Sequence, residues 1–468
     1  MHAHFIKILI SKNKLTITNH PSPIIMDLLT TFFFYALLVT TTKGAHNNPS
    51  PCSESKPDTS GLSIIHIESQ CSPFSTQKPD PWATTVLKMA SKDSERVSFL
   101  DSLIKEQKTT SAPIASGQQV LNIGNYLVRA TVGTPGQLMF MVLDTSLDAG
   151  WVPCSGCLGC SSTMFSPNTS STYGPMDCDS AQCSATTVRG LMCTSSGPEA
   201  CQFNQSYGGD SSFVATLSHD NLSLGKDNIP NYAFGCVNAV SGSNIPPQGL
   251  LGLGRGSLSL MAQSTSLYNG LFSYCLPSYK SYYFSGSLKL GPIGQPRNIR
   301  TTPLLHNPHR PSLYYINLTG ITVGRVQVPI PQEFLSFDPN TGAGTIIDSG
   351  TVITRFVQPV YNSIRDEYRN QTQGPFSSLG AFDTCFSVTH EKVAPTITLH
   401  FQDLDLKLPL ENTLIHSSSG NLACLAMASA PSNVNSVLNI IASLQQQNLR
   451  IMFDTVNSRL GIARELCN

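Results

Sequence analysis

The sequence predicts an all-β protein, mostly strand with few short helices, built from two similar lobes. Short runs rich in β-branched and aromatic residues recur between turns of Gly, Pro, Asn and Ser, as at residues 126–132, 213–217 and 314–318. Helical patterns are few, and the clearest lies at residues 357–369. Two segments far apart in the chain also repeat one pattern, which is typical of a duplicated architecture.

The repeated pattern is an apolar, strand-like run that ends in an Asp. One copy is Met-Val-Leu-Asp-Thr-Ser at residues 141–146, and the other is Thr-Ile-Ile-Asp-Ser-Gly-Thr at residues 345–351. A second apolar run follows each copy, at residues 249–254 and 438–443. Because the copies fall in different lobes, we expect their Asp residues to meet between the lobes, where clefts usually form.

These residues, Asp144 and Asp348, predict a pair that works as acid and base. Two carboxylates held about 3 Å apart cannot both ionise cheaply, so they share one proton. Such a pair activates a water molecule against a peptide carbonyl: the neutral Asp polarises the carbonyl oxygen, and the ionised Asp takes the proton of the water. The chemistry requires no metal, no cofactor and no covalent intermediate. Because the group attacked is a peptide carbonyl, proteins or peptides are the expected substrates.

The cysteine content indicates disulfide bonds rather than a metal site. Among the 14 Cys, the run Cys154, Cys157 and Cys160 has the spacing of a metal or cluster motif. Zinc and iron–sulfur sites need further ligands at set spacing, but the next Cys is Cys178 and no suitable His lies near. We therefore expect disulfide bonds and no metal.

The N-terminal region predicts a secreted protein. The apolar run at residues 26–40 is too short to span a bilayer comfortably, and small residues follow at Gly44 and Ala45, as in a signal peptide. Residues 1–45 are assigned to an N-terminal extension and signal peptide, with translation from Met26 or a long leader as alternatives. A retained N-terminal anchor is the competing interpretation; otherwise no membrane anchor remains after removal of the signal.

Residues 46–112 are predicted to form a cleavable propeptide. They are polar and rich in Pro, and they contain a helical pattern at residues 84–107. The segment 109–117 has the composition of a processing linker, and a permanent N-terminal arm is the alternative. The rest is divided into an N-terminal lobe, residues 113–285, and a C-terminal lobe, residues 286–468.

Composition and charge narrow the classes of function. Hydrophobic residues make up 40% of the chain, enough for a large core, but charged residues make up only 12%, about half the usual share. The 29 Lys and Arg balance 29 Asp and Glu, so no electrostatic footprint for nucleic acid appears. A low charge density also suits a protein that stays folded over a wide pH range, because fewer groups change state.

Sequons agree with passage through the secretory route, whose oxidising environment also lets Cys residues pair. The N-x-Ser/Thr pattern occurs in the presumed mature part of the chain and predicts glycosylation there. The candidate sites are Asn168, Asn204, Asn221, Asn317 and Asn370.

Further motifs are spread over residues 124–468. They are Val-Gly-Thr-Pro at 132–135, Leu-Asp-Thr at 143–145 followed by Trp151 and clustered Cys, Phe-Gly-Cys at 234–236, the Gly-rich run at 249–256, Phe-Ser-Tyr-Cys-Leu-Pro at 272–277, Ile-Asp-Ser-Gly-Thr at 347–351, Gln-Gln-Gln-Asn at 445–448 and Gly-Ile-Ala-Arg at 461–464. Together they resemble a plant pepsin-type aspartic protease of the nepenthesin-like, atypical branch.

The resemblance implies a bilobal pepsin-like fold with the active-site cleft between the lobes. It maps a flap to Tyr207 and Gly208, with the tyrosine closing over the substrate. Hydrogen bonds from Thr145 and Ser349 would brace the two Asp turns against each other. A monomer is expected. The residues expected to support the catalytic carboxylates are Thr145, Ser146, Ser349, Gly350 and Thr351.

The resemblance also suggests a disulfide pattern, although sequence alone leaves the connectivity open. Cys52 and Cys71 of the propeptide are left to pair with each other. The suggested pairs of the mature part are Cys154–Cys157, Cys160–Cys236, Cys178–Cys201, Cys183–Cys193, Cys275–Cys467 and Cys385–Cys424.

Three positions depart from the family pattern. Ser146 replaces a Gly, whose backbone freedom a Cβ atom restricts. Leu147 replaces a Ser whose hydroxyl would bond the catalytic Asp, so we expect a higher proton affinity at Asp144; Thr351 keeps that group in the second half. Ala442 replaces a Gly in the second apolar run, which is the smallest possible change.

The leading hypothesis is a secreted endopeptidase with an acidic optimum, located in the extracellular space, apoplast or cell wall, with the vacuole or a plastid as alternatives. A binding protein on the same fold is the runner-up, because inhibitors of cell-wall-degrading enzymes are similar to this family. Their Asp pairs are usually eroded, whereas both Asp are present here. A DNA-binding plastid protease is disfavoured by the zero net charge and the lack of a basic cluster.

Overall fold

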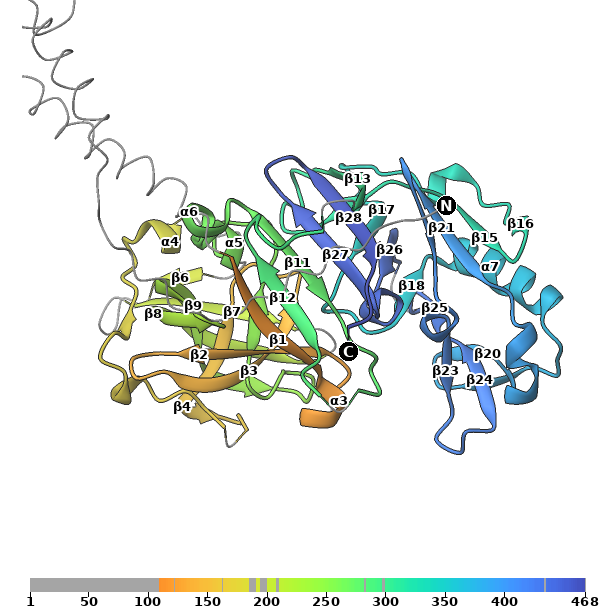
Figure 1. The fold of residues 1–468 in the computed structure, drawn as a ribbon. Helices are drawn as coiled ribbons and strands as arrows, with labels where there is room; N and C mark the ends of the chain where they lie inside the picture. Colours follow the sequence, from red (N-terminus) through yellow and green to blue (C-terminus); the bar gives the residue numbers. More distant parts are fainter. Residues whose placement is uncertain are drawn as a thin grey trace, which may run out of the picture. The chain divides into compact units, whose positions relative to one another are not determined.

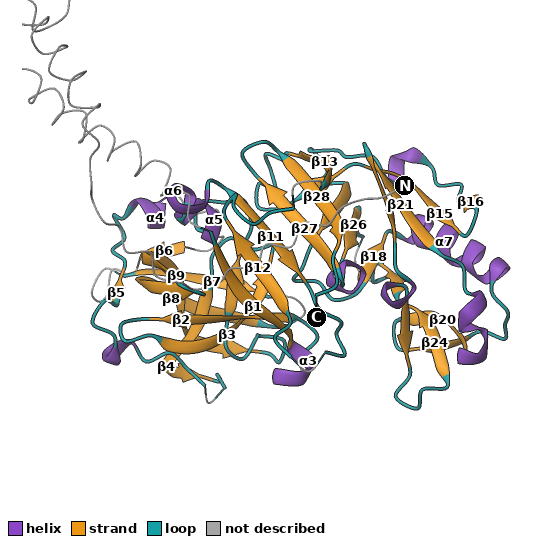
Figure 2. Cartoon of the chain, in the orientation of Figure 1, coloured by secondary structure: helices purple, strands orange, loops and turns teal. Residues whose placement is uncertain are grey.

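The predicted fold class is confirmed: the chain is mostly strand with short helices (Figures 1 and 2). The described residues belong to one compact unit, Phe99–Asn468. The predicted signal peptide and almost all of the predicted propeptide lie outside them and stay predictions. The computed structural model describes residues 109–467, except 122, 162, 185–190, 194–199, 208–209, 282, 297–298 and 433–434.

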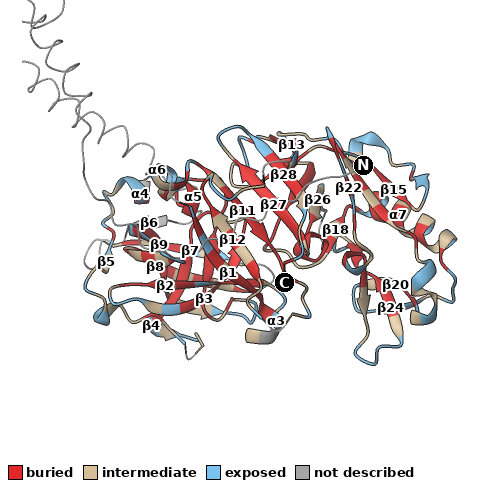
Figure 3. Ribbon diagram, viewed as in Figure 1, coloured by how far each residue is buried: buried red, intermediate tan, exposed pale blue. Residues whose placement is uncertain are grey.

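An antiparallel sheet joins the two halves of the chain. Its pairing of β11 (Leu271–Cys275) with β27 (Leu449–Asp454) places Phe272 opposite Phe453. These rings stack with centroids 4.7 Å apart and are fully buried, so the core continues from one half into the other (Figure 3). The strand order of this sheet is β13 (Arg300–Leu305), β28 (Arg459–Arg464), β27 (Leu449–Asp454), β11 (Leu271–Cys275), β12 (Gly286–Leu290) and β1 (Thr110–Ser116).

The predicted duplication is present as two copies of one parallel strand pair. In the first half, β3 (Gln137–Asp144) lies parallel to β10 (Leu250–Gly252). In the second half, β17 (Gly344–Ile347) lies parallel to β26 (Leu438–Ile441). Parallel strands that are covered on both faces need continuous apolar sequence, which explains the apolar runs. Each Asp therefore lies at the C-terminal end of the first strand of its pair, in equivalent positions of the two halves.

The other elements complete the two halves. In the first half they are β2 (Tyr126–Val132), α3 (Gly117–Val120), β4 (Trp151–Leu158), η1 (Pro167–Thr169), β5 (Gly174–Pro175), α4 (Ala181–Ser184), β6 (Leu191–Cys193), β7 (Cys201–Ser206), β8 (Ser212–Leu224), β9 (Asp227–Ser241), α5 (Leu260–Gln263) and α6 (Thr265–Tyr268). In the second half they are β14 (Tyr315–Ile316), β15 (Leu318–Val323), β16 (Val326–Gln327), η2 (Gln332–Phe334), β18 (Thr354–Phe356), α7 (Gln358–Gln371), β19 (Ser377–Leu379), β20 (Phe382–Ser387), η3 (Val388–Val393), β21 (Ile397–Phe401), β22 (Leu404–Lys407), η4 (Leu410–Asn412), β23 (Leu414–His416), β24 (Leu422–Leu425), β25 (Met427–Ser429) and η5 (Ser443–Gln446).

Helix α7 confirms the helix predicted at residues 357–369. Pro359 lies in its first turn, where the missing N–H loses no hydrogen bond. The buried side chains recur at helical spacing, so one face packs on the core. They are Val360, Tyr361, Ile364 and Tyr368.

The processing linker expected at residues 109–117 is wrong, because most of that segment is strand β1. This strand pairs with β12 on one side and with β2 on the other. Ala112 and Ile114 are fully buried, so the segment fills the core as well as the sheet. Processing is therefore expected before Thr110. The boundaries of the propeptide and of the two lobes stay predictions.

Only part of the expected disulfide pattern is present. Cys275–Cys467 and Cys385–Cys424 are confirmed. The other four expected pairs are wrong, since the structure contains Cys154–Cys236, Cys157–Cys160 and Cys183–Cys201. Cys178 is also disulfide-bonded, and the side chain of Cys193 lies outside the described residues.

Strand register explains the difference in pairing. β4 runs parallel to β9 with Val152 opposite Cys236, which brings Cys154 within a Cα–Cα distance of 5.5 Å of that cysteine. Cys157 and Cys160 then face each other across their own tight turn, with Cα atoms 5.6 Å apart. Both distances suit a disulfide.

The predicted glycosylation sites differ in exposure. Asn168, Asn204 and Asn370 are exposed. Asn221 and Asn317 are half-buried, and their side-chain amides donate hydrogen bonds within the protein. Glycosylation stays a prediction, and the three exposed sites are the more accessible. Over the described ranges, the structure contains no helix with the length and apolar character needed to span a bilayer.

Candidate active site

Asp144 and Asp348 lie at equivalent strand ends, and each residue is only 3% exposed. Asp144 is the last residue of β3, and Asp348 directly follows β17. The carbonyl of Asp144 accepts a hydrogen bond from the N–H of Leu253 (2.8 Å), and the N–H of Asp348 donates to the carbonyl of Ile441 (3.0 Å). In each half the second apolar run therefore anchors the Asp of the first.

The two Asp turns are hydrogen-bonded to each other. The N–H of Ser349 donates to Oγ1 of Thr145 (3.0 Å), and the Ser349 hydroxyl donates to the carbonyl of Leu143 (2.9 Å). The Thr145 hydroxyl donates to Oδ1 of Asp348 (3.4 Å). The structure thus brings together the bracing residues named from the sequence, and each turn restrains the other.

The carboxylate of Asp348 is held at both of its oxygens. The N–H of Gly350 donates to Oδ1 (2.9 Å), while the N–H and the hydroxyl of Thr351 donate to Oδ2 (3.0 and 2.6 Å). The bond from Thr145 adds a further donor at Oδ1. The side-chain amide of Gln446 donates to the Asp348 carbonyl (3.1 Å), a role that the sequence did not reveal.

The carboxylate of Asp144 is held differently. The N–H groups of Ser146 and Leu147 donate to Oδ1 (2.7 and 3.2 Å), and the Ser146 hydroxyl donates to the same oxygen (2.7 Å). The expectation that this turn lacks a hydroxyl donor is therefore wrong, because Ser146 supplies what Leu147 cannot. No N–H or hydroxyl of the described residues donates to Oδ2.

Gly350 lies directly against the carboxylate of Asp144. A Cβ atom at Gly350 would stand 2.3 Å from Oδ2 and 2.5 Å from Cγ of Asp144. Only a residue without a side chain allows this approach. The turn of the second half therefore forms a wall for the carboxylate of the first, as a carboxylate pair requires.

The shared burial shifts the titration of both groups. Burial raises the pKa of Asp144 to about 7, and the negative charge of Asp348 adds to the shift. Burial also raises the pKa of Asp348, while hydrogen bonds from Thr351 and Gly350 oppose the rise. Two such groups titrate as a pair, so the second proton leaves less easily than the first. The site favours a singly protonated pair in mildly acidic solution.

Comparison with known proteins agrees with this geometry. Two family models match the chain: xylanase inhibitor N-terminal over residues 126–292 and xylanase inhibitor C-terminal over residues 313–464. The chain is 62% identical to aspartyl protease AED3 of Arabidopsis thaliana, over 89% of this chain and 94% of that protein. It belongs to the plant pepsin-type aspartic protease family, in the nepenthesin-like branch.

Further relatives support the same family. Aspartyl protease 25 of Oryza sativa subsp. japonica is 50% identical over 87% of this chain and 94% of its own length, and nepenthesin-1 of Nepenthes gracilis is 33% identical over 80% and 84%. The crystal structure of edgp aligns with a TM-score of 0.64 at 19% identity, covering 77% of this chain and 96% of that chain. Conglutin gamma, a basic 7S globulin from lupine seeds, aligns with a TM-score of 0.61 at 20% identity over 76% and 95%. At these identities the structures support the fold alone.

In this aspartic protease fold, Tyr207 lies in the turn between β7 and β8. Its N–H donates to the carbonyl of Ser211 (2.8 Å), which closes the turn. Its ring packs edge-on against Trp151 with centroids 6.0 Å apart. Burial and the charges of the two Asp carboxylates raise the pKa of Tyr207, so the phenol stays neutral and near the pair. The other predicted flap residue, Gly208, lies outside the described residues.

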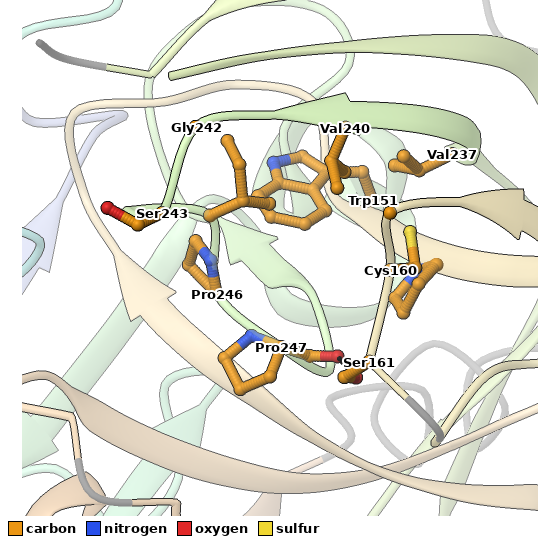
Figure 4. A pocket seen from close by; sticks show the side chains of 12 residues that line it. Trp151, Cys160, Ser161, Val237, Val240, Gly242, Ser243, Pro246 and Pro247 are labelled. Carbon is orange, nitrogen blue, oxygen red and sulfur yellow. Dashed lines mark hydrogen bonds between the residues drawn. The ribbon is translucent and has the colours of Figure 1, made fainter. Parts of the chain in front are cut away.

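A cavity of about 320 Å³ opens beside Trp151 (Figure 4). Its walls come from β4, the segment 159–161, β9 and the loop at residues 242–247, and no charged residue of the described part of the chain lines it. The indole N–H of Trp151 is buried and has no acceptor among the described residues. The cavity therefore suits an uncharged group. Its apolar lining includes Pro153, Val237, Val240, Ile245, Pro246 and Pro247.

Two polar residues that the sequence did not reveal also position the turns. The side-chain amide of Asn125 donates to the carbonyl of Gly350 (2.7 Å). Asp148 is buried and accepts hydrogen bonds from the N–H of Gly256 (2.7 Å) and the hydroxyl of Ser312. The sequence signal that could have identified Asn125 and Asp148 is a polar residue next to apolar residues. In the described part of the chain, no cluster of three His, Cys, Asp or Glu side chains could hold a metal ion.

Proposed function

We propose that the protein is a secreted aspartic endopeptidase that hydrolyses peptide bonds, with an acidic pH optimum. The observation that carries this proposal is the buried pair of Asp144 and Asp348, in which each carboxylate is held by its own turn and the turns brace each other. The identity to two named aspartyl proteases, at 62% and 50%, supports it.

The singly protonated pair is the active form in this proposal. Water adds to the carbonyl carbon of the substrate; the ionised carboxylate takes a proton from that water, and the neutral one donates its proton to the carbonyl oxygen. The C–N bond of the resulting tetrahedral intermediate then breaks as the amine nitrogen receives the proton that the pair took from the water, and a hydroxyl of the intermediate returns its proton to the other carboxylate, which restores the singly protonated pair. Activity falls toward neutral pH because the second carboxyl loses its proton there.

Tyr207 and the cavity beside Trp151 are the two features that fit an extended peptide. Tyr207 on its hairpin would close over the substrate and exclude water from the carboxylates. The cavity beside Trp151 would take an apolar side chain of the substrate, since no charge lines it. We therefore propose proteins or peptides with apolar side chains near the cleavage site as substrates.

A peptidase assay in acid tests the proposal. Purified and processed protein is incubated at pH about 4 with an unstructured protein substrate, beside the Asp348→Ala variant. We expect cleavage by the wild type, its suppression by pepstatin, and none by the variant. Circular dichroism of both proteins controls for folding. A folded, processed wild type without activity would contradict the proposal.

A binding protein is the second candidate, favoured by the two family models described as xylanase inhibitor halves. A binding role alone would leave no reason to keep two buried carboxylates with their donors. In the same assay, an inactive wild type that captures a cell-wall-degrading enzyme with high affinity would support this candidate.

Secretion and assembly state belong to the proposal as well. The disulfides of the described residues need an oxidising route, which supports export through the secretory pathway. We propose an extracellular, apoplastic or cell-wall location for a monomer. The zero net charge gives no support to nucleic-acid binding.

A further inference from the structure

Ser146 and Gly350 occupy matched positions, two residues after the Asp of each turn. Gly350 has no side chain and lies nearest to Oδ2 of Asp144, where a Cβ atom would stand 2.3 Å away. Ser146 has a side chain, which is turned back onto Oδ1 of Asp144. Both positions therefore act on the same carboxylate, one at each oxygen.

The supporting hydroxyl comes from a different position in each turn. Thr351, three residues after Asp348, donates its hydroxyl to that carboxylate (2.6 Å). Leu147 occupies the matching position of the first turn and has no hydroxyl to donate. Ser146, one residue earlier, donates to Asp144 instead (2.7 Å). The supporting hydroxyl therefore comes from the second residue after Asp144 but from the third residue after Asp348, and it reaches Oδ1 in the first turn and Oδ2 in the second.

The change in geometry concentrates the donors on one oxygen. Oδ1 of Asp144 accepts from the N–H and hydroxyl of Ser146 and from the N–H of Leu147, so its lone pairs are occupied. When Asp144 is neutral and its Oδ1 only accepts hydrogen bonds, the proton of the carboxyl group must be on Oδ2. The donors to Asp348 are spread over both oxygens, which stabilises its ionised form.

We infer that Ser146 is a positioning residue: its hydroxyl keeps Oδ1 of Asp144 as an acceptor and leaves Oδ2, beside Gly350, as the oxygen that carries the shared proton. The inference rests on the proposed function and assigns the roles of acid and base to the two carboxylates. Asp144 is the proton donor to the substrate carbonyl, and Asp348 is the base that takes the proton of the water.

The charged surroundings agree with this division. Among the described residues, the titratable groups that face Asp144 are Asp348 and Tyr207. Asp148, on the same loop, is bonded to Gly256 instead. Burial raises the pKa of Asp144 to about 7, and the charge of Asp348 adds to the shift, so Asp144 keeps its proton in mild acid.

The test compares the pH dependence of kcat/KM for the wild type with those of three variants of the first turn. S146A and S146G remove the hydroxyl. Because that hydroxyl stabilises the ionised carboxylate, its loss should move the alkaline limb of the profile upward by about one pH unit. We expect kcat to fall by about 10-fold and KM to change by less than about threefold, since the effect lies on the reacting group.

The third variant, S146G/L147S, moves the hydroxyl to position 147 and rebuilds the arrangement of the second turn. We expect its profile to return to within about 0.3 pH unit of the wild type. The matched control is Ser264→Ala, which removes a buried hydroxyl that bonds the Leu260 carbonyl outside the site. Its profile should equal that of the wild type.

Several outcomes would overturn the inference. S146A could keep the wild-type profile, the double variant could behave like S146G, or Ser264→Ala could shift the limb as far as S146A does. A readout independent of turnover is the titration of ¹³C-labelled Asp carboxyls by NMR, with Asp144→Asn used to assign the signal. If the wild type is inactive but S146A still shifts this titration, the proposed function fails while the positioning role stands. An unshifted titration defeats the positioning role alone.

Discussion

The turn after Asp144 and the turn after Asp348 hold equivalent carboxylates with different residues. Their frames are the same: each Asp ends a buried strand that is paired in parallel with a second apolar run. Their donors differ, because Thr351 supports Asp348 at Oδ2 whereas Ser146 supports Asp144 at Oδ1. The parallel strand pair is thus the repeated unit, and the residues that donate hydrogen bonds to the Asp carboxylate differ between its two copies.

The comparison also shows which position is less free to change. Ser146 is tolerated at the place of a glycine because its side chain folds back onto its own Asp. Gly350, at the matched place, contacts the opposite carboxylate so closely that a side chain has no room. The duplication is therefore symmetric in backbone and asymmetric in chemistry.

Removing either carboxylate should have the largest effect. Asp144→Asn and Asp348→Asn should each lower kcat/KM by about 10³-fold or more, because an amide can neither hold nor accept the shared proton. The double variant should be little worse than either single variant, because the residues act as a unit. Steady-state assays in acid measure this. A single variant that retains a tenth of the wild-type activity would show that the two halves do not work as one pair.

Adding one carbon to Gly350 should have the next largest effect. Gly350→Ala places a Cβ atom 2.3 Å from Oδ2 of Asp144, so the carboxylate must move, and we expect kcat/KM to fall by about 100-fold. Ser146→Ala, the matched change in the first turn, should cost only about 10-fold. Gly320→Ala is the control, since its Cβ would lie 3.0 Å from the flexible amide end of Gln327 and at an ordinary contact distance, 3.9 Å, from the His400 ring. Equal losses at positions 350 and 146 would refute the asymmetry.

The stability of the fold should depend on pH through Asp144. Its folded pKa of about 7 lies above the ordinary value of 3.8, so the folded state holds a proton that the unfolded state has lost. Stability from this group is therefore complete below about pH 4 and is lost as the pH rises to about 7, a loss of about 4 kcal/mol. Denaturant unfolding at pH 4.5 and 7.5 measures it. Asp144→Asn should flatten the dependence, and an unchanged slope in that variant would contradict the assignment.

The braces between the turns should have the smallest effect. Ser349→Ala removes a hydroxyl that donates to the buried carbonyl of Leu143 and should lower the free energy of unfolding by about 1–3 kcal/mol. Thr145→Val removes the acceptor for the Ser349 N–H and should cost a similar amount. Urea unfolding of both variants and of their double variant tests the coupling. Fully additive losses would show that the two bonds do not form one brace.

The strands that carry the two Asp residues and helix α7 could be predicted, because they depend on the local pattern of apolar residues. The apolar runs before the two Asp residues predicted buried strands, and the spacing at residues 357–369 predicted α7. The N-terminal strand β1 was missed, because its Thr, Ser and Pro have loop composition while Ala112 and Ile114 are buried by distant partners. Cysteine pairing was missed for the same reason, since it follows the register of β4 against β9.

Local sequence pattern was enough to establish that the chain is duplicated, is mostly β and has one Asp at the end of each repeated strand, because burial and periodicity are visible in consecutive residues. The tertiary structure alone decided which oxygen of each Asp accepts which donor, that Ser146 replaces the hydroxyl missing at Leu147, and that Gly350 borders the opposite carboxylate. The placement of these groups depends on how two turns that are distant in the chain pack against each other, and no local pattern encodes that packing.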